Sequence, residues 1–224
     1  MKHKNKKRLW LLPVLILLYL AVGAVFPFLN YKEVKEGTGL MPELASMVEG
    51  KQDAFVDRAM ILETNLGAWE ERLRLINQAE ERIILSTFDM RDGESTKDLL
   101  ALILEKADQG VKVQIMVDGF SGLVSMTGRS LFHDVSSHPN IEIRHYNPIH
   151  LLKPWTPQGR MHDKYVIVDD IGYILGGRNS FDYFIGDYDT EHGSLDREVL
   201  VYNSAHGTND GLSSSLYQVE NYFQ

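Results

Sequence analysis

The chain has 224 residues and no cysteine, which excludes disulfides and cysteine-ligated metal sites. Its formal net charge is −8, but residues 1–29 carry five basic and no acidic residues, and the remainder carries 18 basic against 31 acidic residues. A domain this acidic lacks the broad basic surface expected of a nucleic-acid binder, so nucleic acid is a disfavoured partner.

Residues 10–29 form an uncharged apolar run behind a basic segment, residues 1–9. A run of about 20 such residues is long enough for one helical pass across a bilayer. The basic segment predicts a cytoplasmic N-terminus, so we expect a single-pass protein of the cell membrane whose remaining domain is extracytoplasmic. A cleavable signal peptide is the alternative, because Val22, Gly23 and Ala24 form a possible cleavage site. The apolar run continues to Leu29 and favours a retained transmembrane anchor.

Residues 30–60 have the composition of a polar connector with weak helical stretches, and residues 61–224 are long enough for one domain with its own core. Apolar periodicity and turn residues predict these further elements: helices over residues 65–81, 95–107, 121–135 and 212–223, and strands over residues 82–88, 111–117, 141–145, 165–168, 173–175 and 196–202. The strand–helix–strand order in the first half predicts an α/β fold, a mixed β-sheet flanked by helices.

The loop over residues 150–157 contains apolar and cationic side chains. Leu151, Leu152 and Trp155 form a candidate apolar lip that meets lipid chains, although loop aromatics also pack locally. His150 and Lys153 are candidate contacts of a headgroup phosphate, with ordinary loop residues as the alternative.

The segment from His162 to Asn179 carries the chemistry. His162 and Lys164 are two residues apart, so on an extended chain both side chains point to the same face. The pair Gly176-Gly177 lets the backbone approach a ligand closely, and Asn179 adds an uncharged amide. An imidazole, a fixed cation and a hydrogen-bond donor at one place suit a phosphate group.

This spacing resembles the HKD motif of the phospholipase D superfamily: His162, Lys164, Asp169 and the Gly-Gly-Arg-Asn sequence that ends at Asn179. The chain is most similar to the N-terminal half of bacterial cardiolipin synthase-like proteins, from about Asp57 to the C-terminus. The resemblance implies a phospholipase D-like lobe preceded by one transmembrane helix.

The resemblance also implies roles for the site residues. His162 would attack phosphorus and form a phosphohistidine, while Lys164 and Asn179 would hold the non-bridging oxygens. A carboxylate at the start of the last strand would hydrogen-bond the imidazole and fix its orientation. Asp196 is the candidate for this role, and Glu198 is the alternative.

Asp169 belongs to the motif and therefore to the candidate catalytic set. It is, however, an odd number of residues from both His162 and Lys164, so on a regular strand it would face away from them. We interpret it as a structural turn residue. The implied chemistry requires no metal and no cofactor.

The sequence contains a single HKD motif, because His192 and His206 are not followed by lysine two residues later. In the superfamily a second motif supplies the acid for the leaving group. Two arrangements remain open: a homodimer whose site forms across a symmetric interface, or a bilobed enzyme whose second HKD-containing lobe is absent from this sequence. Because the chain ends within a predicted helix, we expect the second arrangement slightly more than the first.

These features predict a membrane-anchored phospholipase D or phosphatidyltransferase that acts on phospholipids, with cardiolipin synthesis as the specific version. One alternative is a single-motif nuclease that acts as a dimer. Another is a half-lobe without activity of its own that supports a second HKD protein. The acceptor alcohol stays open, since water, glycerol and a second lipid all fit the same intermediate.

Overall fold

The computed structural model describes residues 10–29, 55–188 and 191–224. The chain divides into two compact units. The larger unit contains residues 56–148 and 160–224, and the smaller contains the chain up to residue 55 together with residues 149–159. The basic segment 1–9 and most of the expected connector, residues 30–54, lie outside the described residues.

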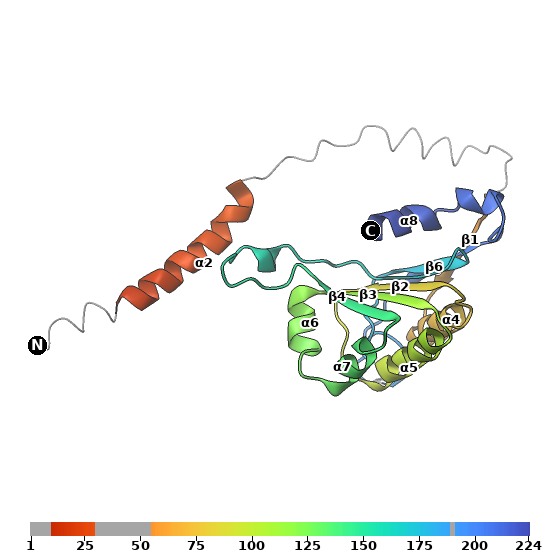
Figure 1. The fold of residues 1–224 in the computed structure, drawn as a ribbon, viewed down its shortest axis with the longest axis horizontal. Coiled ribbons are helices and arrows are strands. Elements are labelled where there is room, and N and C mark those ends of the chain that lie inside the picture. The colour runs from red at the N-terminus through yellow and green to blue at the C-terminus, as the bar shows by residue number, and fades with distance from the viewer. Residues whose placement is uncertain (1–9, 30–54, 189–190) are drawn as a thin grey trace, which may run out of the picture. The chain divides into compact units, whose positions relative to one another are not determined.

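A seven-stranded mixed sheet forms the centre of the larger unit, in the order β1-β7-β6-β5-β2-β3-β4 (Figure 1). The strands are β1 (Asp57–Leu62), β2 (Arg82–Thr87), β3 (Lys112–Asp118), β4 (Ile141–Tyr146), β5 (Tyr165–Val168), β6 (Gly172–Gly176) and β7 (Glu198–Asn203). β2, β3 and β4 are parallel neighbours, whereas β2 with β5, β5 with β6, β6 with β7 and β7 with β1 are antiparallel.

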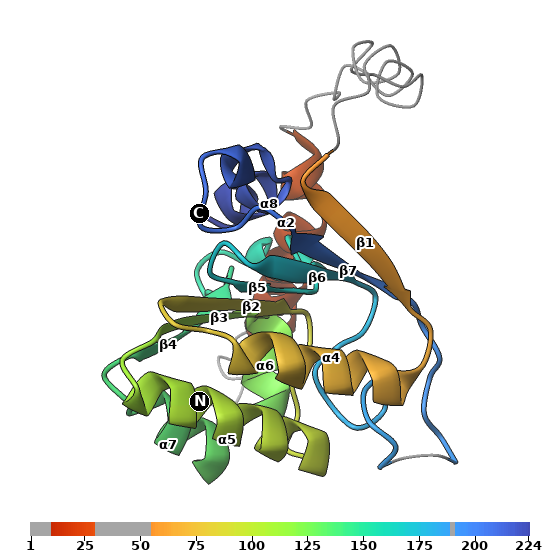
Figure 2. The ribbon, with the colours of Figure 1, turned by 90° about the vertical axis from the view of Figure 1, so that its right-hand side faces the viewer.

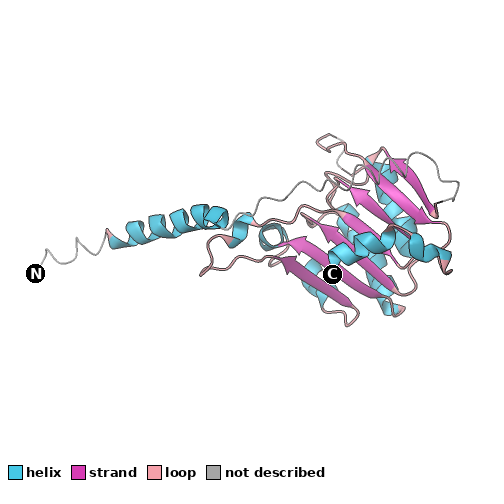
Figure 3. Cartoon of the chain, turned by 90° about the horizontal axis from the view of Figure 1, so that it is seen from above, coloured by secondary structure: helices cyan, strands magenta, loops and turns pink. Residues whose placement is uncertain are grey.

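Helices cover both faces of this sheet (Figures 1 and 2). The helices of the larger unit are α4 (Asn65–Asn77), α5 (Glu94–Asp108), α6 (Gly119–Ser125), α7 (Ser130–Ser136), η2 (Asp210–Ser213) and α8 (Leu216–Phe223). α4, α5 and α7 lie on one face, and α8 crosses the strands on the other (Figure 3). This architecture confirms the predicted fold class.

The core consists of two apolar clusters, one on each face of the sheet. Ile83 and Leu85 of β2 belong to the cluster under α4 and α5, while Ile84 between them packs with Ile167 and Leu216 on the α8 face. Successive strand side chains point to opposite faces, so a strand covered on both faces buries successive positions instead of alternate ones. The apolar run Ile83–Leu85 is therefore explained by the central place of β2 in the sheet.

Three elements of the larger unit differ from the sequence-based expectation. The helix expected over residues 212–223 is η2 followed by α8, with Ser214 extended between them. β1 begins at Asp57, inside the expected connector 30–60; it is an edge strand with four consecutive exposed residues, so its sequence lacks the alternation of a half-buried strand. The helix expected over residues 121–135 is two helices: α6 ends at Ser125, and Gly128, with φ +78°, lies in the turn before α7 begins at Ser130.

The smaller unit contains α2 (Leu11–Leu29) and the loop over residues 149–159 with its short helix η1 (Thr156–Gln158). α2 has 19 residues and is long and apolar enough to cross a membrane. Nearly all of its side chains are exposed, and Gly23 is its one buried residue. An apolar helix at the predicted place is thus present.

Candidate active site

The topology of the sheet gathers the motif at one edge. β5 is antiparallel to β2 and β6, and β6 is antiparallel to β7. The start of β5, the end of β6, the start of β7 and the end of β2 therefore lie together. His162 precedes β5, Asn179 follows β6, Asp196 precedes β7 and Phe88 follows β2. Residues separated by more than 100 positions in the chain thus meet at this edge.

Phe88 is the common neighbour of His162 and Lys164. Its ring lies 4.8 Å from the imidazole of His162, centroid to centroid, and 5.6 Å from Nζ of Lys164. Nζ of Lys164 also donates a hydrogen bond of 2.7 Å to the backbone oxygen of His162. Both side chains face one ring, as expected for residues two positions apart on an extended chain.

Lys164 is buried, with 4% of its surface exposed, which matters for its charge. Burial lowers the pKa of Lys164 because it disfavours the ammonium form, and the carboxylates of Asp163 and Asp196 oppose that lowering. A cation held in this way, close to carboxylates and an aromatic face, is positioned for an anionic ligand before the ligand arrives.

Asn179 and Gly177 complete the edge. Oδ1 of Asn179 accepts a hydrogen bond of 3.1 Å from the backbone N–H of Asp89, so Nδ2 is the end of this amide that can donate to a phosphoryl oxygen. A Cβ on Gly177 would overlap the carboxylate of Asp196, with 2.6 Å to its Cγ. Glycine at this position lets the carboxylate lie against the backbone.

Asp169 lies at the opposite edge of the sheet, because it follows the end of β5 whereas His162 precedes the start. Its backbone has φ +46°, and its carboxylate accepts hydrogen bonds from the backbone N–H groups of Glu80 (2.7 Å), Glu81 (3.1 Å) and Arg82 (2.6 Å). The structure separates Asp169 from the other motif residues. Its inclusion in the catalytic set is corrected, and its interpretation as a structural turn residue agrees with this position.

Glu198, the alternative partner of the imidazole, is occupied elsewhere. Its carboxylate receives two hydrogen bonds from Arg72, of 2.6 and 2.5 Å, and Arg178 lies 3.7 Å away. All three side chains are buried. Asp196 remains the candidate of the two: its Oδ1 accepts from the backbone N–H of Arg197 (2.7 Å), and no hydrogen bond to His162 is present among the described residues.

Gly176, the first glycine of the pair, packs against this buried carboxylate. A Cβ at Gly176 would overlap the side chain of Glu198, with 2.8 Å to its Cα. Gly176 also donates its backbone N–H to the oxygen of Lys164 (3.2 Å). Its place is between two strands, whereas Gly177 faces Asp196.

Phe88 and Arg160 are site residues that the motif did not indicate. The Arg160 guanidinium lies 4.9 Å from the ring of Phe88 and 4.9 Å from that of Phe120. Its Nε is 2.9 and 2.8 Å from the two carboxylate oxygens of Asp118. Burial alone would raise the pKa of Asp118, but the hydrogen bonds from Arg160 and from the backbone outweigh burial and lower it. The place of Arg160 two residues before His162 was the sequence signal that could have indicated it.

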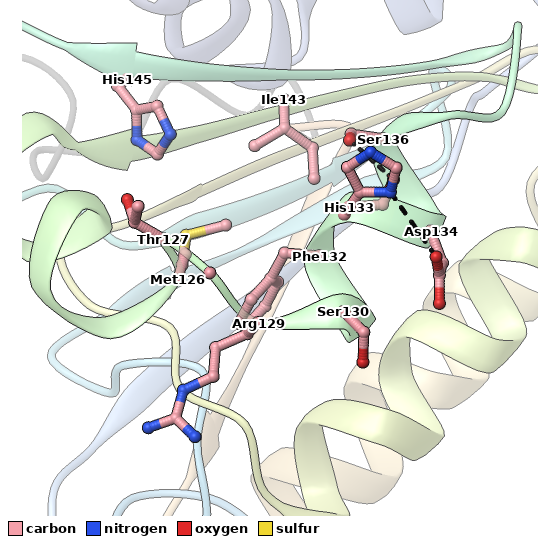
Figure 4. A pocket seen from close by; sticks show the side chains of 11 residues that line it. Met126, Thr127, Arg129, Ser130, Phe132, His133, Asp134, Ser136, Ile143 and His145 are labelled. Atoms are coloured by element: carbon pink, nitrogen blue, oxygen red, sulfur yellow. Dashed lines mark hydrogen bonds and ion pairs between the residues drawn. The ribbon is translucent and has the colours of Figure 1, made fainter.

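A cavity of about 370 Å³ adjoins His162 and is lined by residues 160–163 before β5 and by residues of β3, β4, β5 and α8, including Tyr146 and Tyr222. A second cavity, of about 510 Å³, lies between the α6–α7 connection and β4 (Figure 4). Its lining includes Arg129, His133 and His145 but no motif residue. Of these two cavities, the one at His162 is therefore the one that the motif histidine can serve.

Comparison with known proteins agrees with this geometry. The family described as "Cardiolipin synthase, PLD-like domain" matches residues 73–192. An uncharacterised protein of Helicobacter pylori strain J99 is 32% identical over 189 residues, which cover 78% of this chain and 35% of that protein. Cardiolipin synthase C of Escherichia coli K12 is 30% identical over 139 residues, covering 56% of this chain and 28% of that protein.

This chain therefore spans about a third of the length of the curated relatives that it matches. Among solved structures, NucT from Helicobacter pylori superposes with a TM-score of 0.52 at 15% identity, covering 75% of this chain and 94% of that chain. At this identity the similarity concerns the fold.

Proposed function

Because the chain belongs to the phospholipase D-like family, we propose that it is a phosphodiesterase whose nucleophile is His162. The observation that carries this proposal is the packing of an imidazole and a buried lysine on one aromatic ring, beside a cavity of about 370 Å³. In the proposed reaction a ring nitrogen of His162 bonds to phosphorus, and the bond to the leaving alcohol oxygen breaks. A second alcohol or water then takes the phosphoryl group from the histidine.

The neighbouring polar groups have distinct proposed roles. The ammonium of Lys164 and Nδ2 of Asn179 stabilise the charge that develops on the non-bridging oxygens. Asp196 orients the imidazole, which requires its carboxylate to turn from Gly177 toward His162 when substrate binds. Arg160 lines the cavity and is a further cation for the phosphate.

We further propose that the substrates are membrane phospholipids, with formation of cardiolipin from two phosphatidylglycerol molecules as the specific version. The apolar helix α2 supports this, because a retained span keeps the domain at the bilayer, and so does the similarity to cardiolipin synthase C. The protein is then a single-pass protein of the cell membrane with its catalytic domain outside the cytoplasm. The acidic composition disfavours nucleic acid.

The leaving alcohol needs a proton, and one HKD motif supplies one histidine. We propose that a second phospholipase D-like lobe contributes the acid, from a second copy of this chain in a homodimer or from another HKD-containing lobe. The short span of this chain relative to its relatives is compatible with either source.

The test is to incubate the full chain with phosphatidylglycerol in mixed micelles and to identify the lipids formed by mass spectrometry. Cardiolipin or phosphatidic acid above the level of a His162→Ala control is the expected result. Neither product above that control contradicts the lipid proposal. Salt-sensitive cleavage of DNA that Lys164→Ala abolishes would replace it with a nuclease.

A further inference from the structure

A close contact joins α2 to the loop that precedes the motif. Gly23 is the one buried residue of α2, and Pro154 covers it. A Cβ at Gly23 would lie 2.8 Å from the backbone oxygen of Pro154 and 3.1 Å from its Cβ. Glycine is therefore what lets the loop approach the helix axis, as small residues do where helices pack in membranes.

Two further contacts come from the same side of the helix. The rings of Phe26 and Trp155 stack, with centroids 4.3 Å apart and an interplanar angle of 28°. Nε2 of Gln158 donates a hydrogen bond to the backbone oxygen of Gly23. Residues three apart share a helix face, so Gly23 and Phe26 present one surface to one loop. Three kinds of contact, close packing, ring stacking and a hydrogen bond, thus join residues 149–159 to α2.

The loop leaves its two leucines uncovered. Leu151 is 80% exposed and Leu152 93% exposed, while the neighbouring Trp155 is engaged with Phe26. Gly23 lies six residues before the end of α2, which is about 9 Å along the axis at a rise of ~1.5 Å per residue. That depth matches the ~5–10 Å by which interfacial apolar groups enter a bilayer, where Trp is also enriched.

We propose that α2 is a retained span and that residues 149–159 dock on it as an interfacial element, with Leu151 and Leu152 inserted among lipid chains. This inference rests on the membrane anchorage in the proposed function. Cleavage after Ala24 would separate Gly23 from the domain that carries Pro154, so the docking requires the uncleaved chain.

Engineered cysteines test the docking, since the natural chain has none. In the full chain in membranes, we expect Phe26→Cys with Trp155→Cys, which keeps glycine at position 23, to form a disulfide on mild oxidation. Trypsin then yields residues 9–32 linked to residues 145–160, which mass spectrometry identifies. Phe28→Cys with Trp155→Cys is the matched control, because residue 28 lies on the opposite side of the helix from residue 26. Equal linkage in the two pairs, or a mature chain that starts at residue 25, overturns the proposal.

Fluorescence quenching tests the insertion separately. A Leu152→Cys variant labelled with an environment-sensitive dye, in phosphatidylglycerol vesicles, is expected to be quenched by nitroxide-labelled lipids. Labelled Leu212→Cys, from an exposed leucine in η2, is the control and stays unquenched. Equal quenching at the two positions overturns the insertion. Neither readout needs turnover, so both results stand whether or not phosphatidylglycerol is converted.

Discussion

At the scale of single residues, Phe88 links three cationic or titratable groups: its ring contacts His162, Lys164 and Arg160. A cation over an aromatic face gains roughly 0.5–2 kcal/mol. We therefore expect Phe88→Leu, which keeps an apolar side chain but removes the ring, to lower kcat/KM by about 10-fold through misplaced cations. The measurement is the rate of phosphodiester cleavage together with the thermal midpoint.

Phe120→Leu is the matched control for that variant. Phe120 also has Arg160 4.9 Å from its ring, but the ring that His162 and Lys164 contact is that of Phe88. Activity should stay within a few-fold of the wild type in this variant. If the two variants lose activity equally, the effect of Phe88 does not run through His162 and Lys164.

Asp196 and Glu198 are separated by two positions but have different expected roles. Removing Glu198 leaves the guanidinium of Arg72 buried without its partner, which costs about 3–5 kcal/mol. Glu198→Gln should thus lower the urea midpoint strongly. Asp196→Asn should lower kcat while the urea midpoint changes little, since Asp196 is partly exposed. Stability loss in Asp196→Asn, or a stable but inactive Glu198→Gln, would exchange these roles.

Asp118, beside Arg160, makes the stability of the folded protein depend on pH. Burial alone would raise the pKa of Asp118 in the folded protein, but the hydrogen bonds from Arg160 outweigh burial and lower it. The contribution of Asp118 to the free energy of unfolding is therefore fully present above the unfolded pKa of about 4. It is lost as the pH falls through the lower pKa of the folded state. Asp118→Asn should therefore be less stable than the wild type at pH 6. The difference in the free energy of unfolding between variant and wild type, measured by urea titration, should become smaller as the pH falls below about 4. A constant difference would contradict the lowered pKa.

Sequence spacing was sufficient to select His162, Lys164 and Asn179, because a short hairpin brings them together. Asp196 was selected through the resemblance to the phospholipase D superfamily. The catalytic roles of all four residues stay predictions. Phe88 could not be selected. Its place depends on the pairing of β2 with β5, a contact between segments some 80 residues apart that no local pattern encodes.

At the scale of elements, the turn between β5 and β6 is fastened to the start of β2 by Asp169. Its carboxylate accepts three backbone N–H groups, and a hydrogen bond to a charged group is worth roughly 1.5–3 kcal/mol. Asp169→Ala should lower the free energy of unfolding by about 3 kcal/mol. The folded fraction should keep its kcat. A stable variant with reduced kcat would instead indicate that Asp169 has a catalytic role.

The elements that sequence predicted well are those with strong periodicity. α5 and the central strands have buried stripes or runs, and the predicted segments match them to within a few residues. The misses have local causes. β1 is an edge strand exposed on most positions, and Gly128 leaves the helical region at a point where the flanking apolar pattern still looks continuous.

At the scale of the whole molecule, the candidate site has one histidine where the proposed reaction uses two, one as nucleophile and one as acid. In a homodimer both would be His162, related by a two-fold axis. The molar mass of the detergent-solubilised chain, corrected for bound detergent, distinguishes a dimer from a monomer.

Subunit mixing then tests whether both histidines serve one reaction. If each site needs His162 from two copies, a mixed dimer with His162→Ala has no complete site. Equal amounts of wild type and variant, unfolded together and refolded, should retain about a quarter of the activity of wild type alone. Independent sites predict about half. The Leu212→Ala variant, far from the motif in sequence and outside the cavity at His162, is the mixing control and should leave activity unchanged. A result near half would mean that the acid comes from another lobe or from solvent.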